Sequence, residues 1–198
     1  MKRREMLKQT GLAAFAFATG CHNKESGLTD PVPNSSTDLN CQQTSHDMEG
    51  PYYPPELPDK TILYENEGQK VILKGRVLSN LCTPVSDGLI QIWHADQFGE
   101  YDLSNGIRRY TGQQSLVDGT FEFETLLPGA YANGPDSFRP KHFHIKIIID
   151  GSAVLTTQLY FIDDDYLQYE PNLPDSRKME LTQDDTGALN GFFEFVLS

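Results

Sequence analysis

Two histidines stand two residues apart in the stretch RPKHFHI, residues 139–145. Side chains alternate across a β-strand, so His142 and His144 are expected on one face and Phe143 on the other. An imidazole is costly to bury without a partner, and two of them on one face make a candidate metal site. The same spacing also occurs in strands whose histidines are only structural, so the remaining ligands must decide.

The segments around this strand offer oxygen as the further ligand. Tyr101 and Tyr131 lie in two long irregular segments, 99–119 and 127–139, and loops of that length are uncommon unless they carry a site. The sequence has no HExxH motif and no cysteine pair at zinc-binding spacing. Phenolate oxygen and imidazole together suit a hard, highly charged cation such as ferric iron. The residues alone therefore predict two histidines plus oxygen ligands around an oxidised transition metal.

The elements that would position these side chains are β-strands. Short runs rich in β-branched and aromatic residues are separated by turn signals such as Asp118-Gly119 and Asp150-Gly151. The expected strands span residues 71–78, 89–94, 120–125, 142–149, 154–161 and 192–197. Residues 164–170 allow one helical turn, and no segment has a long helical period. We therefore predict an all-β fold, a single antiparallel β-sandwich with long site-bearing loops and little helix.

The first 21 residues are typical of an export signal. Basic Lys2, Arg3 and Arg4 precede a short apolar stretch, 12–18, which is followed by small residues and Cys21. The arginine pair also resembles a twin-arginine signal, and the residues ending at Cys21 resemble a lipobox. We expect lipidation of Cys21; the alternative is an ordinary secretory signal with an incidental cysteine.

The rest of the chain is predicted to be a polar tether, 22–40, and one catalytic domain, 41–198. The expected location is periplasmic or at the cell surface, as a membrane-anchored lipoprotein. The chain has 198 residues and a net charge of −12, which argues against binding to nucleic acid or to anionic lipid by charge.

Two cysteines, Cys41 and Cys82, remain after Cys21. In an exported protein the simplest expectation is that they form a disulfide. The alternative is two unrelated buried thiols.

Several blocks of the sequence resemble the intradiol ring-cleavage dioxygenases, close to the protocatechuate 3,4-dioxygenase type. The blocks run in the family's order and cover most of the chain after residue 40. They are EGPYYPP (49–55), GRVLSNLCTPVSDGLIQIWHADQFGEYD (75–102), DGTFEFETLLPGAY (118–131), NGPDSFRPKHFHIKI (133–147) and TTQLYF (156–161). The combination of GxY, PGxY and RPxHxH makes the resemblance specific.

The resemblance implies a non-haem Fe(III) site. Tyr101 matches the tyrosine that stays on iron, and Tyr131 matches the one that leaves when substrate binds. His142 and His144 match the histidine ligands, and Arg139 matches the active-site arginine.

A substrate pocket is also implied by the resemblance. Gln158 matches a pocket glutamine, and Gly50, Pro51 and Tyr52 match the segment that walls the cavity. The pair 132–133 departs from the aromatic-basic pair that often follows PGxY. No residue matches a carboxylate-recognising group of protocatechuate enzymes, which leaves the substrate open.

The implied reaction is cleavage of a catechol-type diol by O2 to a cis,cis-muconate-type diacid. Two alternatives remain at this stage. One is a non-catalytic cell-surface β-sandwich that binds a partner and keeps a vestigial metal site. The other is a different metal with oxidase or hydrolytic chemistry. The sequence leaves the oligomeric state open, including a homo-oligomer.

Overall fold

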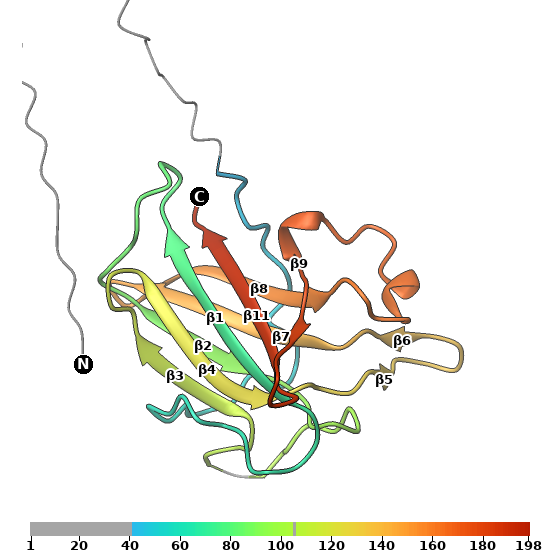
Figure 1. Cartoon of the computed structure of the whole chain (residues 1–198). Helices are drawn as coiled ribbons and strands as arrows, with labels where there is room; N and C mark the ends of the chain where they lie inside the picture. Colours follow the sequence, from blue (N-terminus) through green and yellow to red (C-terminus); the bar gives the residue numbers. More distant parts are fainter. Residues whose placement is uncertain (1–40, 105) are drawn as a thin grey trace, which may run out of the picture. The chain divides into compact units, whose positions relative to one another are not determined.

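The computed structural model describes residues 41–104 and 106–198, and the regular secondary structure of this part of the chain is almost wholly β-strand (Figure 1). Its helical elements are two 3₁₀ turns, η1 (Leu167–Tyr169) and η2 (Asp175–Arg177). Within these residues no helix is long and apolar enough to cross a membrane. The predicted signal peptide, its Cys21 and the predicted tether fall on residues 1–40, outside the described residues.

Two sheets form the sandwich. The first has the strand order β10-β11-β1-β4 and the second β3-β2-β7-β8-β9. The strands of the first sheet are β1 (Lys70–Leu78), β4 (Thr120–Leu126), β10 (Thr182–Gln183) and β11 (Leu189–Val196). Those of the second are β2 (Leu89–Trp93), β3 (Thr111–Ser115), β7 (His142–Ile149), β8 (Ser152–Phe161) and β9 (Lys178–Met179). A separate hairpin pairs β5 (Tyr131–Ala132) with β6 (Phe138–Arg139).

Apolar side chains from the facing sides of the sheets meet in one core. Leu73 of β1 and Phe123 of β4 belong to the same buried cluster as Phe143 and Ile145 of β7. Between the buried positions of β1, Lys74 is exposed, which is the period-two pattern of a strand with one wet face. Burial of this apolar set is the main force that holds the two sheets together.

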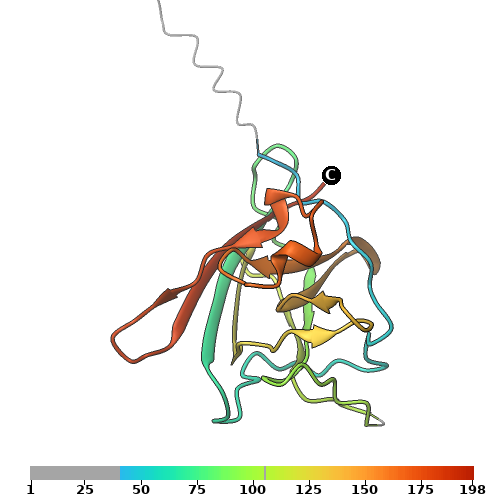
Figure 2. The ribbon, with the colours of Figure 1, turned by 90° about the vertical axis from the view of Figure 1, so that its right-hand side faces the viewer.

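β7 is different because both of its faces are covered. His142, His144 and Lys146 alternate with the core residues, yet they are only 3%, 3% and 8% exposed. The segment 44–56 runs along this outer face of the second sheet (Figure 2). The polar face of β7 is therefore an interior surface.

Specific bonds hold the segment 44–56 in place. The backbone N–H of Asp47 donates to the carbonyl oxygen of Thr156 at 2.9 Å. The hydroxyl of Tyr53 donates to Oε1 of Gln91 at 2.8 Å. Both partners belong to the second sheet, so the segment acts as a strap across it.

All six predicted strands are present, as β1, β2, β4, β7, β8 and β11, and the predicted β-sandwich is confirmed. The expectation of purely antiparallel pairing is wrong in detail, because β1 pairs with β11 and β8 with β9 in parallel. β3 was not expected, since its sequence TGQQS is polar and has no alternation. β3 is a strand because it pairs with β2, a contact that its own sequence does not predict.

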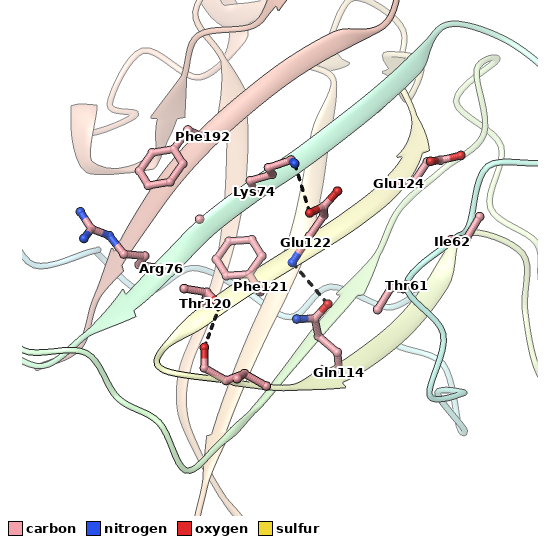
Figure 3. Close-up of a pocket in the computed structure, with 12 residues that line it drawn as sticks. Thr61, Ile62, Lys74, Arg76, Gln114, Thr120, Phe121, Glu122, Glu124 and Phe192 are labelled. Carbon is pink, nitrogen blue, oxygen red and sulfur yellow. Dashed lines mark hydrogen bonds and ion pairs between the residues drawn. The ribbon is translucent and has the colours of Figure 1, made fainter.

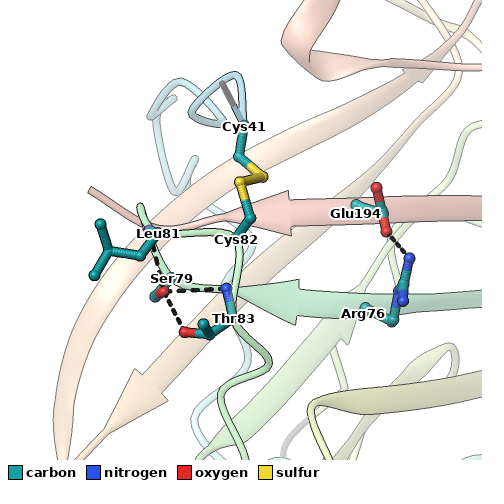
Figure 4. The surroundings of a disulfide bond; sticks show 7 residues. All are labelled: Cys41, Arg76, Ser79, Leu81, Cys82, Thr83 and Glu194. Atoms are coloured by element: carbon teal, nitrogen blue, oxygen red, sulfur yellow. Dashed lines mark hydrogen bonds and ion pairs between the residues drawn. A yellow bond between two sulfur atoms is a disulfide. The ribbon is translucent and has the colours of Figure 1, made fainter. Parts of the chain in front are cut away.

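A disulfide joins Cys41 to Cys82, whose Cα atoms are 5.7 Å apart (Figure 4). Cys82 lies in the turn that follows β1 and has a positive φ of 61°. Ser79 organises this turn, because its Oγ accepts the backbone N–H groups of Leu81 and Thr83 at 3.2 and 3.4 Å. The bridge thus ties the residues just before the strap to the turn that follows a core strand.

The double variant Cys41→Ser/Cys82→Ser should be less stable than the oxidised protein by about 3–4 kcal/mol. The bridge closes a loop with a sequence separation of 41 and so restricts the unfolded chain. Urea unfolding of both proteins measures the difference, and reduced wild type should match the double variant. Two titratable thiols in the denatured, unreduced protein would contradict the bridge.

Candidate functional site

His142 and His144 lie side by side under the strap. Their Nε2 atoms are 3.2 Å apart. Nδ1 of His142 is 2.6 Å from the carbonyl oxygen of Pro140, which can only accept, so Nδ1 carries the proton and Nε2 presents its lone pair. The ring of His144 stacks on Trp93 with centroids 4.9 Å apart. Two oriented, buried nitrogens therefore form one half of a ligand set.

Tyr101 completes a triangle of donor atoms. Its hydroxyl oxygen lies 3.0 Å from Nε2 of His144 and 3.4 Å from Nε2 of His142. Ligands bonded about 2.1 Å from one cation lie about 3.0–3.4 Å from each other, so this triangle has the size of one face of a coordination shell. Among the described residues, no three histidine, cysteine, aspartate or glutamate side chains are grouped to hold a metal. Tyrosine oxygen is thus what completes the set.

A close contact between two loops brings Tyr101 to the histidines. The carbonyl oxygen of Asp96 accepts the backbone N–H groups of Gly99 and Gly129 at 3.1 and 2.8 Å. A Cβ on Gly99 would lie 2.6 Å from the carbonyl oxygen of Ala130, and Gly99 has φ +83°. Only glycine fits there, and it lets the loop of Tyr101 lie against the PGAY loop.

The PGAY loop ends in Tyr131. Its ring centroid is 5.8 Å from that of Tyr101 and 5.8 Å from that of His142. Tyr131 begins β5 and pairs across the hairpin with Arg139. The structure therefore brings the four predicted metal ligands into one cluster, with the predicted catalytic arginine beside them.

Burial governs the protonation of this cluster. It lowers the pKa of His142 to about 4 and that of His144 well below its usual value, so both imidazoles are neutral near pH 7. Burial also raises the pKa of Tyr101, with Tyr131 adding to the rise, and raises the pKa of Tyr131 against the opposing effect of Arg139. A bound cation favours the phenolate form and the neutral imidazole form, so the donor set fits a cation of high charge.

Arg139 is held by a buried polar network on β8. Its Nη2 donates to Oε1 of Gln158 and to the hydroxyl of Tyr160, both at 2.6 Å. The Tyr160 hydroxyl in turn donates to Oε1 of Gln158 at 2.8 Å. Nε2 of Gln158 donates to the carbonyl oxygen of Met48 in the strap at 2.9 Å. Every bond of this network fixes the guanidinium next to the ligand cluster.

The strap residues Gly50, Pro51 and Tyr52 border the cluster to different degrees. The ring of Tyr52 stacks on that of Tyr101 with centroids 4.2 Å apart. A Cβ on Gly50, which has φ +76°, would lie 3.3 Å from Cε1 of His144. Pro51 is exposed. Tyr52 and Gly50 thus contact candidate ligands directly, and Pro51 links them.

A family model described as dioxygenase matches residues 48–191. The chain is 32% identical over 117 residues to the protocatechuate 3,4-dioxygenase beta chain of Burkholderia cepacia, covering 52% of this chain and 49% of that protein. This chain belongs to the intradiol ring-cleavage dioxygenase family. The predicted family is confirmed.

Two further proteins are similar to this member of the intradiol dioxygenase family. It is 29% identical over 150 residues to the chlorocatechol 1,2-dioxygenase of Rhodococcus opacus, covering 63% of this chain and 58% of that protein. The solved dioxygenase domain of a dioxygenase carbohydrate-binding protein fusion from Streptomyces sp. SirexAA-E is 31% identical, with a TM-score of 0.71, over 79% of this chain and 98% of that chain. The chain spans about half the length of the curated relatives described here, 49% and 58%.

Three residues of this candidate site were not predicted from the sequence. They are Trp93, which stacks on His144, Tyr160, which holds Arg139, and Glu170, which lies beside Arg139. Tyr160 could have been predicted, because it lies two residues from Gln158 and therefore on the same face of β8. Nothing in the sequence signalled Glu170.

A cavity of about 800 Å³ lies away from this site, on the outer side of the first sheet (Figure 3). Lys74, Glu122 and Phe192 line it together with residues of neighbouring segments, and none of the predicted site residues does. It is separate from the histidine face of the second sheet.

His94 is structural in this fold rather than a fifth ligand. Its Nδ1 lies 2.7 Å from the carbonyl oxygen of Ala95 and its Nε2 2.7 Å from Oγ1 of Thr125, so both ring nitrogens are engaged. Burial lowers its pKa to about 4, and the carbonyl of Ala95 opposes this shift.

The variant His94→Gln should flatten the pH dependence of stability between about pH 6.5 and 4. In this window an unfolded histidine takes up a proton while folded His94 stays neutral, so stability falls as pH falls. Each such histidine contributes up to about 1.4 kcal/mol per pH unit. Urea unfolding at several pH values compares the slopes. Equal slopes for the metal-free variant and wild type would contradict a neutral, buried His94.

Proposed function

We propose that this protein binds non-haem Fe(III) and uses O2 to cleave a catechol-type diol between its two hydroxyl-bearing carbons, giving a cis,cis-muconate-type diacid. Its ligands are Tyr101, Tyr131, His142 and His144. The observation that carries the proposal is the triangle formed by the Tyr101 oxygen and the two Nε2 atoms, with sides of 3.0, 3.2 and 3.4 Å. The relatives are named as dioxygenases of catechol, chlorocatechol and protocatechuate.

The donor set supports ferric iron over softer or less charged ions. Two neutral imidazoles supply no charge, and two phenols ionise in this buried place only beside a strong positive charge. When bound, the ion would act as a Lewis acid toward the hydroxyl oxygens of the diol and make the ring reactive toward O2.

We assign different roles to the two tyrosines, Tyr101 and Tyr131, because their surroundings differ. The ring of Tyr101 is stacked under Tyr52 and its oxygen contacts both histidines, which suits a ligand that stays. Tyr131 lies in a two-residue strand of a hairpin. Its phenolate oxygen is the group we propose to accept a proton from the incoming diol.

Arg139 supplies positive charge where the ring gains electron density. Its side chain is 16% exposed, and its Nη2 is fixed by Gln158 and Tyr160. A guanidinium already held in place needs no reorganisation as negative charge develops on the substrate oxygens.

We also propose that the protein works outside the cytoplasm, anchored through a lipid on Cys21. The predicted export signal supports this proposal. A disulfide in the domain is consistent with it, because such bonds persist in oxidising compartments.

The purified, iron-loaded protein should be wine-red from tyrosinate-to-iron charge transfer, and it should consume one O2 for each diol converted to a diacid. Absorption spectra, metal analysis and oxygen uptake with a panel of catechols measure this. A folded, colourless protein that retains no iron after reconstitution would favour the non-catalytic binding module. Another metal with no ring cleavage would favour the different-metal alternative.

The variant Tyr131→Phe should stay coloured with a shifted band and lose roughly hundredfold or more in turnover, because it keeps three ligands but loses a positioned base. Tyr101→Phe should instead lose iron itself, since its oxygen contacts both histidines. Spectra and bound iron separate the two variants. An unshifted band with normal cleavage in Tyr131→Phe would remove Tyr131 from the site.

A further inference from the structure

We propose that Glu170 sets the charge preference of the substrate pocket, so that the protein selects uncharged catechols over catechols that carry a ring carboxylate. Glu170 does this by pairing with Arg139 and by placing a fixed negative charge beside it. The inference rests on the proposed function and names the substrate class of that same site.

The contact between Glu170 and Arg139 is an ion pair at the edge of the site. Nε of Arg139 lies 3.0 Å from Oε1 of Glu170, and the two side chains are 16% and 32% exposed. The Nε–H is buried and has no hydrogen-bond acceptor among the described residues, so charge rather than hydrogen-bond geometry holds the pair. With Nη2 held by Gln158 and Tyr160, two edges of the guanidinium are already engaged.

Glu170 is positioned by the segment between β8 and η2. The carboxylate of Asp164 accepts the backbone N–H groups of Lys141 and Tyr166 at 2.6 and 2.8 Å. Phe138, which precedes Arg139, packs on Tyr166 and Tyr169 with ring centroids 4.8 and 5.8 Å away. These contacts fasten the segment to the β5–β6 hairpin, and the residue that follows Tyr169 meets Arg139.

The charge of Glu170 reaches the place where the diol would bind. Glu170 contacts Arg139 at 3.0 Å, and Arg139 pairs with Tyr131 across the β5–β6 hairpin. A negative group entering beside Tyr131 and Arg139 therefore comes close to the carboxylate of Glu170, and two like charges repel each other.

Three cations near the site are already neutralised by carboxylates, and Arg108 instead donates to the carbonyl oxygen of Tyr52. Lys146 pairs with Glu49 in the strap, and Arg177, whose guanidinium lies 5.8 Å from the Tyr160 ring centre, pairs with Asp47. With Arg139 taken by Glu170, a ring carboxylate would enter as an unpaired charge in a partly desolvated pocket, which is unfavourable. An uncharged catechol carries no such penalty.

The test compares 3,4-dihydroxybenzoate with 3,4-dihydroxybenzamide, which has nearly the same shape and no charge. Wild type should favour the amide by at least about tenfold in kcat/KM, which corresponds to about 1.4 kcal/mol. Glu170→Gln should reduce this ratio about tenfold, mainly through KM, because it removes the negative charge and releases the charge of Arg139. The ratio cancels any general loss of activity or fold.

Two matched variants control for other causes. Glu170→Asp keeps the charge and should retain most of the preference. Asp165→Asn removes one negative charge from an exposed position of the same segment and should leave the ratio unchanged. A thermal unfolding scan of each variant verifies that it is folded.

Wild type that cleaves both compounds equally, or an unchanged ratio in Glu170→Gln, would overturn the proposal. A preference for the benzoate would also overturn it and point to Arg108, whose Nη1 donates to the carbonyl oxygen of Tyr52 at 3.2 Å. If no diol is cleaved, the proposed function fails separately. Calorimetric titration then measures the affinity of the protein for each compound. Equal affinities, or no binding of either compound, would count against the role of Glu170.

Discussion

The arrangement of this protein depends on a polar face that is kept away from water. β7 buries apolar residues toward the core and presents two histidines and a lysine on its other face, and all three are less than a tenth exposed. Buried polar groups are stable only when they have partners. The strap provides part of them, since Glu49 pairs with Lys146 and Met48 accepts from Gln158. The two imidazoles are left to face each other and a phenol, and such a donor set fits a cation of high charge.

The loops at the end of the sandwich converge on the same place through backbone contacts. Asp96 bonds the loop of Tyr101 to the loop of Tyr131, and the absence of a side chain at Gly99 lets the two backbones touch. The hairpin of β5 and β6 then sets Arg139 opposite Tyr131. Residues that are far apart in the chain are thus positioned by contacts between backbone atoms.

Much of this could be predicted from local pattern. The period-two alternation of β7 places His142 and His144 on one face whatever the rest of the chain does, and both lie there. β3 escaped prediction because its polar TGQQS owes its structure to pairing with β2, a contact between distant residues. Trp93 and Glu170 escaped for a related reason. Trp93 reads as a core residue of a strand, and only the register with β7 sets it opposite His144. Glu170 follows a 3₁₀ turn whose position depends on aromatic packing against β6.

The same interactions that stabilise the domain also shape its chemistry. The chain carries a net charge of −12, and three cations around the site, Arg139, Lys146 and Arg177, each have their own carboxylate. These ion pairs hold Arg139 and the strap in place, and each pair has a net charge close to zero. A site built in this way gains rigidity, because each of these basic side chains is held by more than one neighbour. Under the proposed charge preference, selectivity comes from the ring and its two hydroxyls rather than from a charged substituent. Arg139 is the residue in which both effects meet: Glu170 holds it in place and lowers the net charge that it offers to a ligand.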